Sequence, residues 1–282
     1  MEDLLKYNFT VKSNIHNYQV EFIKDTKRSL LRELNSGDFI IIDNKIKKLY
    51  FEELKEILND FNSICINSNE TQKSYQDLEP IIEKLIENGF RKNHRLISIG
   101  GGITQDCTAF MASVLYRGVS WFFYPTSLLA QADSCIGSKT SINFKTYKNL
   151  IGGFYPPNKI LINPNFLNSL EYKELKSGLG EMLHYFIVSG KNDFDYFKLN
   201  YNDALTNKTV LSKLIARSLE IKKKYIEIDE FDKKERQVFN YGHSFGHAIE
   251  SITNYQIPHG IAVSFGMDIS NYISLKLGLI NE

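Results

Sequence analysis

The stretch NYGHSFGHAIE, residues 240–250, holds two of the chain's six histidines, His243 and His247, and His259 follows shortly afterwards. Histidines four residues apart lie on one face of a helix, which is a common way to provide two ligands of a zinc site. Two interpretations are open. Either His243 and His247 bind one metal ion together, or each has a separate role.

Glu181 could supply a carboxylate to such a site. It lies in SGLGEMLHYF, an apolar segment that predicts a helix. A carboxylate there lies either at the edge of the helix or at a ligand site. With His243 and His259 it would make a set of two histidines and one carboxylate, which leaves coordination positions open for substrate and water.

Three further polar residues precede the histidines: Lys222, Arg236 and Asn240. Because the segment from Glu235 to Asn254 favours helix, Arg236 and Asn240 should share a face with each other and approximately with the two histidines. An arginine beside a metal site suits a carboxylate or phosphate partner. The alternative for Lys222 and Arg236 is that they lie on a solvent-exposed helix face. This alternative is well supported for the lysine run 222–224 as a whole.

A glycine run, GGG (100–102), follows a predicted strand and opens a predicted helix. Such a turn lets a phosphate approach the backbone N–H groups of the helix N-terminus, although a simple tight turn is an equal alternative. Asp43, at the end of another predicted strand, could bind a ribose hydroxyl. Its alternative is an ordinary turn residue.

The segment 125–157 is rich in Gly, Ser, Thr, Lys and Asn but also carries apolar residues. We expect Lys139, Lys148 and Asn149 to gather on an anion while Asp133 takes a hydroxyl. The alternative is a long structured surface loop with solvated lysines.

The elements that must position these residues alternate in type up to about residue 165. Apolar runs predict strands at 38–44, 63–67, 95–100, 119–125 and 159–164, and periodic segments predict helices at 51–61, 75–90 and 105–116. This order indicates a parallel sheet covered on both faces. From residue 166 onward the chain favours helix. We therefore expect an α/β domain over 1–165 and a helical domain over 166–282.

The overall composition argues against several classes of function. The 34 Lys and Arg nearly balance 33 Asp and Glu, so no global charge favours nucleic acid or a membrane surface. Three separated cysteines make neither a disulfide framework nor a CxxC metal pattern. No secretory signal or membrane-spanning apolar run is evident, and we expect a cytoplasmic protein.

Several blocks in order resemble the 3-dehydroquinate synthases and, more broadly, the sugar phosphate cyclases. The blocks are NETQKS (69–74), GGGITQD (100–106), LYRG (115–118), PTSLLAQADSCIGSKT (125–140), KNLIGGFY (148–155), GLGE (178–181), NYGHSFGHAIE (240–250) and HG (259–260). The resemblance implies an N-terminal Rossmann-like domain that binds NAD and a C-terminal helical domain that binds a divalent metal, with the active site between them. Zinc is the expected metal, with cobalt as an alternative. A homodimer is also implied.

The resemblance assigns roles by motif position. The metal ligands are Glu181, His243 and His259. The NAD contacts are Asp43, Glu70, Lys73, Gly101, Gly102, Asp106, Thr126, Ser127, Lys148, Phe166 and Ser169. The substrate contacts are Arg117 (from the partner subunit), Asp133, Lys139, Asn149, Lys222, Arg236, Asn240 and His247. The catalytic residues are His247, Lys139, Asn240 and Asp232, and His247 acts on a proton near the phosphate.

This chain departs from the family pattern in several places. His184 replaces a lysine that holds a substrate hydroxyl, and Asp232 replaces a glutamate. Gln105 replaces a glycine, and GSK replaces GGK. The family normally continues beyond the position of Glu282, so we expect a truncated helical domain.

The implied activity is conversion of 3-deoxy-D-arabino-heptulosonate 7-phosphate to 3-dehydroquinate. It proceeds through transient oxidation by NAD, β-elimination of phosphate, reduction and intramolecular aldol addition. Two alternatives are a cyclase acting on a neutral sugar phosphate, of the 2-deoxy-scyllo-inosose or 2-epi-5-epi-valiolone synthase type, and an inactive NAD-binding homologue. A metal-dependent alcohol dehydrogenase is a third, weaker alternative.

Overall fold

The computed structural model describes residues 4–281 and divides the chain into two compact units, one ending at Ser169 and one beginning at Leu170. The sequence placed this division after residue 165. The intervening 3-10 turn η5 (Pro164–Ser169) belongs with the first unit, because its Phe166 side chain is buried in that unit's hydrophobic core.

A seven-stranded sheet forms the centre of the first unit. Its order is β1-β2-β9-β6-β5-β3-β4, and all neighbours are parallel except β1 and β2. The strands expected from residue 38 onward are confirmed as β3 (Phe39–Asp43), β4 (Asn62–Ile66), β5 (Leu96–Gly100), β6 (Trp121–Pro125) and β9 (Lys159–Ile162). Strands β1 (Phe9–Val11) and β2 (Tyr18–Phe22) were not expected.

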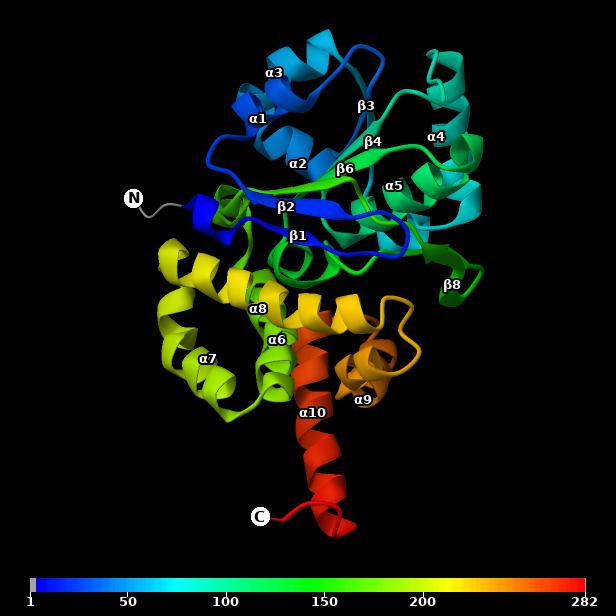
Figure 1. Ribbon diagram of the computed structural model, residues 1–282. Coiled ribbons are helices and arrows are strands. Elements are labelled where there is room, and N and C mark those ends of the chain that lie inside the picture. Colours follow the sequence, from blue (N-terminus) through cyan, green and yellow to red (C-terminus); the bar gives the residue numbers. More distant parts are fainter. Residues whose placement is uncertain (1–3, 282) are drawn as a thin grey trace. The chain divides into compact units, whose positions relative to one another are not determined.

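Continuous apolar runs form the central strands because helices cover both faces of the sheet. Helices α1 (Thr26–Glu33), α2 (Asn44–Leu49) and α3 (Phe51–Asp60) lie on one face, and α4 (Tyr75–Glu87) and α5 (Gly102–Val114) lie on the other (Figure 1). The core between the first face and its helices includes Leu30, Ile40, Ile42, Leu54 and Ile99.

The strand order creates a topological switch point at β3. The chain passes from β3 to β4 on one side and then returns to β5 on the other side. In open α/β sheets, ligands bind outside the carboxyl ends of the strands at such a point. Asp43 and Gly100 end the two strands concerned, so this topology brings the predicted ribose and phosphate contacts to the same edge.

The segment 125–157 is largely ordered secondary structure rather than a loop, although its Lys139 and Lys148 are exposed, as the surface-loop alternative expected. A π-helical turn (Ala130–Ser134) is followed by a hairpin of β7 (Lys139–Phe144) and β8 (Tyr147–Phe154). Lys139 pairs with Phe154 at the open end of the hairpin, whereas Lys148 lies beside its turn. The hairpin therefore holds the two lysines at opposite ends.

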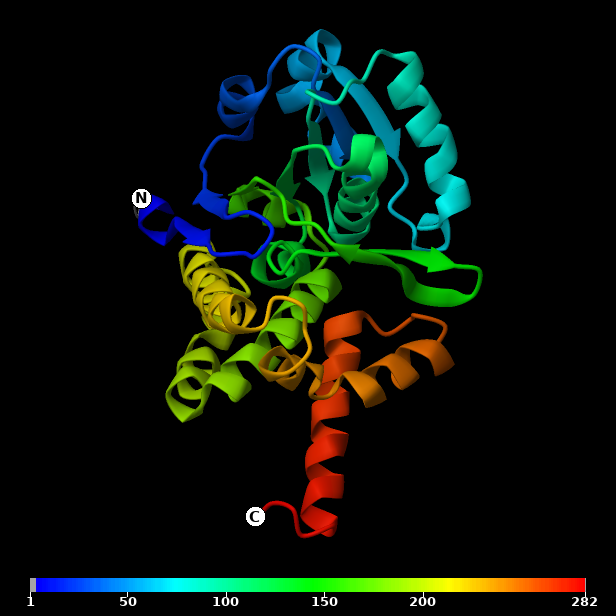
Figure 2. The ribbon, with the colours of Figure 1, turned by 45° about the vertical axis from the view of Figure 1, so that its right-hand side comes forward.

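The second unit is helical. It contains α6 (Tyr172–Ser189), α7 (Lys191–Ala204), α8 (Lys208–Ile228), the 3-10 turn η6 (Glu235–Asn240), α9 (His243–Ile252) and α10 (His259–Lys276). The later part of α10 projects beyond α6 and α9 in both views (Figures 1 and 2), and its Tyr272 side chain is exposed. Among the described residues, no helix is long and apolar enough to cross a bilayer.

The prediction of one continuous helix from Glu235 to Asn254 is wrong. Gly242 has φ +79° and separates η6 from α9. A β-carbon at Gly242 would lie 2.8 Å from the Val263 carbonyl oxygen, so α10 leaves no room for a side chain there. Arg236 and Asn240 consequently do not share a helical face with His243 and His247.

Candidate functional site

The three residues proposed as metal ligands converge within the second unit. Glu181 lies in the middle of α6, while His243 and His259 are the first residues of α9 and α10. His243 Nε2 is 3.6 Å from Glu181 Oε1, and His259 Nε2 is 3.3 Å from Glu181 Oε2. One donor atom from each residue lies within 4.8 Å of the other two, which suits a single cation.

Close helix packing produces this convergence. Gly260 follows His259 directly, and a β-carbon there would collide with the Ser177 carbonyl oxygen of α6. The Gly260 N–H also donates a 3.0 Å hydrogen bond to Ser177 Oγ. The start of α10 therefore lies against α6 one turn before Glu181, which brings His259 to the carboxylate.

The electrostatics of the cluster favour added positive charge. Burial alone would raise the pKa of Glu181, but His184, His243 and His259 outweigh it and hold this pKa well below its ordinary value. Burial lowers the pKa of His259, yet its contacts with Glu181 and Glu250 raise that pKa to about 10. The buried Glu181 Oε2 also has no well-formed hydrogen bond. Ligand types, convergence and charge all fit a divalent metal.

Two more histidines border the cluster. His184 is fully buried on α6, and its Nδ1 is 3.6 Å from Glu181 Oε1. The ring of His247 stacks on that of His259, with centroids 5.6 Å apart. Burial lowers the pKa of His247, and the nearby His259 and His243 lower it further. His247 is therefore mostly neutral at pH 7 and able to accept a proton.

Two of the predicted substrate contacts are buried cations in this unit. Lys222, on α8, is 6% exposed, and its Nζ lies 5.8 Å from the centre of the Tyr185 ring. Arg236 is 4% exposed and donates a 2.7 Å hydrogen bond to the Glu230 carbonyl oxygen. The alternative of a solvent-exposed face is wrong for both residues, although Lys224 is exposed. Asn240 is exposed at the end of η6, and Asp232 has φ +54°.

The glycine loop of the first unit leads into the start of α5. Gly101 is the N-cap and makes no side-chain capping bond. A β-carbon on Gly101 or Gly102 would meet Ser127 Oγ at 3.4 Å or Ser134 Oγ at 3.9 Å. The backbone N–H groups at the start of α5 therefore have no side-chain cap and lie near two hydroxyls, which suits a phosphate group. Asp43 is the N-cap of α2, and its Oδ1 accepts a 2.7 Å hydrogen bond from Lys45 N.

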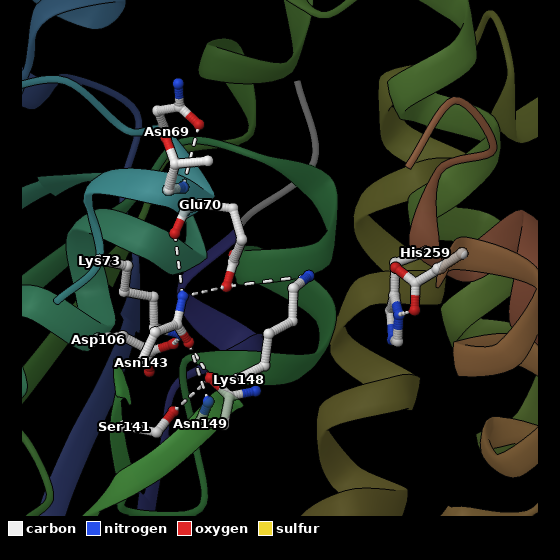
Figure 3. Close-up of polar contacts among 11 residues, drawn as sticks. Asn69, Glu70, Lys73, Asp106, Ser141, Asn143, Lys148, Asn149 and His259 are labelled. Carbon is white, nitrogen blue, oxygen red and sulfur yellow. Dashed lines mark hydrogen bonds and ion pairs between the residues drawn. The ribbon is translucent and has the colours of Figure 1, made fainter. Parts of the chain in front are cut away.

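A second group of predicted residues in the first unit forms a connected polar network, which includes Asp106 of α5 (Figure 3). The buried Lys73 lies 2.5 Å from Asp106 Oδ2 and 2.7 Å from Asn149 Oδ1. Burial raises the pKa of Asp106, against the opposing effect of Lys73. Lys148 Nζ lies 3.9 Å from Glu70 Oε1. The structure thus brings together four residues predicted to contact NAD and one predicted to contact substrate.

The remaining predicted residues of the first unit lie on several elements. Thr126 and Ser127 follow β6, Asp133 lies in the π-helical turn, and Phe166 and Ser169 lie in η5. Ser169 Oγ accepts a 3.0 Å hydrogen bond from the Tyr50 hydroxyl. Arg117 is exposed and has φ +65°.

Two site residues were missed by the sequence analysis. Asn143 accepts a 2.9 Å bond from Asn149 N and donates 2.9 Å bonds to both Glu70 O and Glu70 Oε1. Glu250 contacts His259 Nδ1 through its Oε2 at 3.1 Å. Glu250 lies inside the quoted stretch NYGHSFGHAIE, three residues after His247, but sequence spacing gives no sign of its contact with His259.

Gln105, at the position where the sequence pattern departs from glycine, links two segments of the first unit. Its Nε2 donates to the Ser134 carbonyl oxygen at 2.6 Å, and its Oε1 accepts from Ser134 Oγ at 2.7 Å. The side chain therefore holds the π-helical turn against α5.

Comparison with known proteins gives consistent matches over both units. Family models described as the N-terminal and C-terminal parts of 3-dehydroquinate synthase match residues 63–177 and 178–282. The 3-dehydroquinate synthase of Campylobacter fetus is 36% identical over 282 residues, covering 99% of this chain and 79% of the relative. That of Campylobacter concisus gives the same identity and coverage.

Solved structures show the same fold. The 2-epi-5-epi-valiolone synthase of Streptomyces hygroscopicus, solved with NAD+ and Zn2+ bound, has a TM-score of 0.85 at 25% identity, covering 94% of this chain and 76% of that one. A 2-deoxy-scyllo-inosose synthase also has a TM-score of 0.85, at 21% identity, covering 97% of this chain and 79% of that one.

Proposed function

The chain belongs to the 3-dehydroquinate synthase family, and we propose that it converts 3-deoxy-D-arabino-heptulosonate 7-phosphate to 3-dehydroquinate with release of phosphate. Close relatives of that activity span nearly the whole chain. The observation that carries the proposal is the convergence of Glu181, His243 and His259, because this reaction needs a cation-binding set beside titratable groups.

Two cofactors follow from this function, and the residues present fit both. Glu181, His243 and His259 would hold a divalent metal, and we propose zinc as the native ion. The glycine loop and the polar network of the first unit would hold NAD. When bound, NAD accepts and returns a hydride within the turnover, and the metal polarises a ring hydroxyl. The residues assigned to NAD are Asp43, Glu70, Lys73, Gly101, Gly102, Asp106, Thr126, Ser127, Lys148, Phe166 and Ser169.

The protein's own contribution is positioning and proton transfer. The buried Lys222 and Arg236 provide fixed positive charge for an anionic substrate, and Arg236 can bind a carboxylate with two parallel hydrogen bonds. We assign Asn240 as a further residue that contacts the substrate. His247, whose pKa is lowered, accepts a proton near the phosphate group and can return it. Lys139 and Asp232 complete the catalytic set, and Asp133 and Asn149 complete the substrate contacts.

The buried His184 has a different role from the lysine it replaces. Its Nδ1 contacts Glu181 Oε1 at 3.6 Å, so it supports the metal-binding carboxylate. Because Lys222 and Arg236 are both present and buried, the carboxylate-bearing substrate is favoured over a neutral sugar phosphate.

The assembly and location are part of the same proposal. We place the enzyme in the cytoplasm, where NAD and sugar phosphates are available and where its three free cysteines stay reduced. A homodimer would let the exposed Arg117 reach the substrate of its partner subunit.

Phosphate release tests the function directly. Protein reconstituted with zinc and NAD should release phosphate from 3-deoxy-D-arabino-heptulosonate 7-phosphate and yield 3-dehydroquinate in equal amount, without net accumulation of NADH. Neutral sugar phosphates should give no release. Release from the neutral sugars alone would overturn the proposal, and NAD binding with no release from any substrate would identify an inactive homologue.

A further inference from the structure

His259 lies between two carboxylates that contact its two ring nitrogens. Glu181 Oε2 is 3.3 Å from Nε2, and Glu250 Oε2 is 3.1 Å from Nδ1. Glu250 comes from α9 and His259 from α10, so the contact joins two elements that already pack against each other. The Glu250 side chain is 13% exposed, which is unusual for a glutamate that has no specific role.

A metal on Nε2 of His259 would take the place of the proton there, and the Glu250 contact then keeps the remaining ring proton on Nδ1. A carboxylate accepts a hydrogen bond, so Glu250 favours a proton on Nδ1 of His259. The Nε2 lone pair then faces Glu181, where the proposed metal lies. In known metal sites such an outer carboxylate fixes the ring and makes the ligand nitrogen more basic, and its loss costs about 10- to 100-fold in metal affinity.

We infer that Glu250 is a positioning residue of the metal centre, which acts through His259 rather than on the metal itself. This inference rests on the metal site of the proposed function. Glu250 also belongs to a second group of possible ligands, with His247 and His259. A direct ligand and a positioning residue differ in what their removal does to the number of ions bound and to the ligand field.

The test compares Glu250→Ala and Glu250→Gln with a matched control, Glu235→Gln, whose glutamate is exposed on η6. Zinc affinity is measured by competition with a chelator, and the cobalt-loaded proteins are compared by visible absorption. We expect Glu250→Ala to lower affinity about 10- to 100-fold with one ion still bound at saturation, and to shift the cobalt bands. Glu250→Gln should lose less, because its amide oxygen still accepts the Nδ1 proton. Glu235→Gln should match the wild type.

Two results for Glu250→Ala would overturn the inference. Wild-type affinity with unchanged cobalt bands would show that Glu250 does not position His259. Loss of the bound ion as complete as in Glu181→Ala would show that Glu250 is itself a ligand. Circular dichroism of the metal-free variants would show whether each is folded. If Glu250→Ala does not fold, the same two results for Glu250→Gln would overturn the inference.

The proposed function fails by a different result. Wild-type protein that binds zinc but releases no phosphate would overturn the reaction and leave the role of Glu250 standing. Wild-type protein that binds no zinc would overturn the metal site and this inference together.

Discussion

His243 and His247 lie one turn apart on α9 with ring centroids 5.5 Å apart, and His243 Nε2 contacts Glu181 Oε1 at 3.6 Å. His247 is more exposed, and its ring stacks on that of His259. Spacing alone left open whether the two histidines share one metal ion. Their surroundings in the structure favour separate roles.

Replacing each histidine should therefore give a different loss. We expect His243→Ala to lose at least about 100-fold in zinc affinity, because it removes a ligand from the set. His247→Ala should keep its zinc and lose about 10²- to 10⁴-fold in kcat, because it removes a proton carrier. Metal content after dialysis and the rate of phosphate release measure the two effects. Equal loss of zinc from both variants would support a shared metal face instead.

The three converging residues of the candidate metal site were recognisable from sequence motifs, but the residues that contact the candidate sites were not. Glu181, His243 and His259 carry the chemistry that a metal needs, and their residue types are visible in the sequence. Asn143 contacts Glu70, which is 73 residues away, and Glu250 contacts His259 on the next helix. Their side chains have no distinctive spacing, so only the fold reveals them.

Asn143 joins the loop before α4 to the β7–β8 hairpin, and its removal should loosen both. Besides its side-chain bonds to Glu70 and Asn149, its backbone N–H donates to the Lys73 carbonyl oxygen at 2.7 Å. We expect Asn143→Ala to weaken NAD binding about 10-fold, equivalent to about 1.4 kcal/mol, because it leaves polar groups of the network unpaired. Tryptophan fluorescence titration with NAD measures this change.

Thr146→Ala provides the control, since Thr146 is exposed in the turn of the same hairpin. It should bind NAD as the wild type does. Unchanged NAD binding by the folded Asn143→Ala variant would show that the network does not position cofactor contacts.

Elements with a clear hydrophobic pattern could be predicted from the sequence. A helix boundary that is set by packing against another helix could not. Strands β3, β5 and β6 are near-continuous apolar runs, so their burial on both faces is evident from sequence. Strand β2 alternates instead, with Gln19 exposed between the buried Tyr18 and Val20, and it was missed. The break in the helix at Gly242 depends on contacts with Val263 and Met267 of α10, which are not visible in the local sequence.

The contact between α7 and α8 predicts a dependence of stability on pH. Arg217 binds Asp193 with two hydrogen bonds, Nε to Oδ1 and Nη2 to Oδ2, each 2.8 Å long. The hydrogen bonds from Arg217 lower the pKa of Asp193. Because the folded-state pKa is lowered, the pair stabilises the protein above the ordinary Asp pKa of about 3.9, and this stability is lost as pH falls through the lower folded value.

Asp193→Asn should therefore reduce the free energy of unfolding by about 1 kcal/mol at pH 7, and the difference from wild type should shrink as pH falls below about 4. Urea unfolding followed by circular dichroism measures both. Asp195→Asn is the control, because the Lys191–Asp195 pair on the same helix is exposed and should contribute little. A difference that stays constant down to pH 2 would rule out the ionised pair as its cause.

Gly242 should tolerate no side chain, because its backbone and its surroundings both exclude one. It has φ +79°, and an added β-carbon would lie 2.5 Å from Met267 Cγ and 2.8 Å from the Val263 carbonyl oxygen. Gly89 has a similar φ of +85° but nothing within 4 Å of the added carbon. Gly89→Ala therefore measures the backbone strain alone, which should reduce the free energy of unfolding by about 1 kcal/mol.

We expect Gly242→Ala to reduce the free energy of unfolding by at least about 2 kcal/mol and to lower zinc affinity, because α9 must move away from α10 and carry His243 with it. Urea unfolding and chelator competition measure the two effects. Equal destabilisation by both substitutions, with zinc affinity unchanged, would show that close packing at Gly242 does not hold His243 in the metal site.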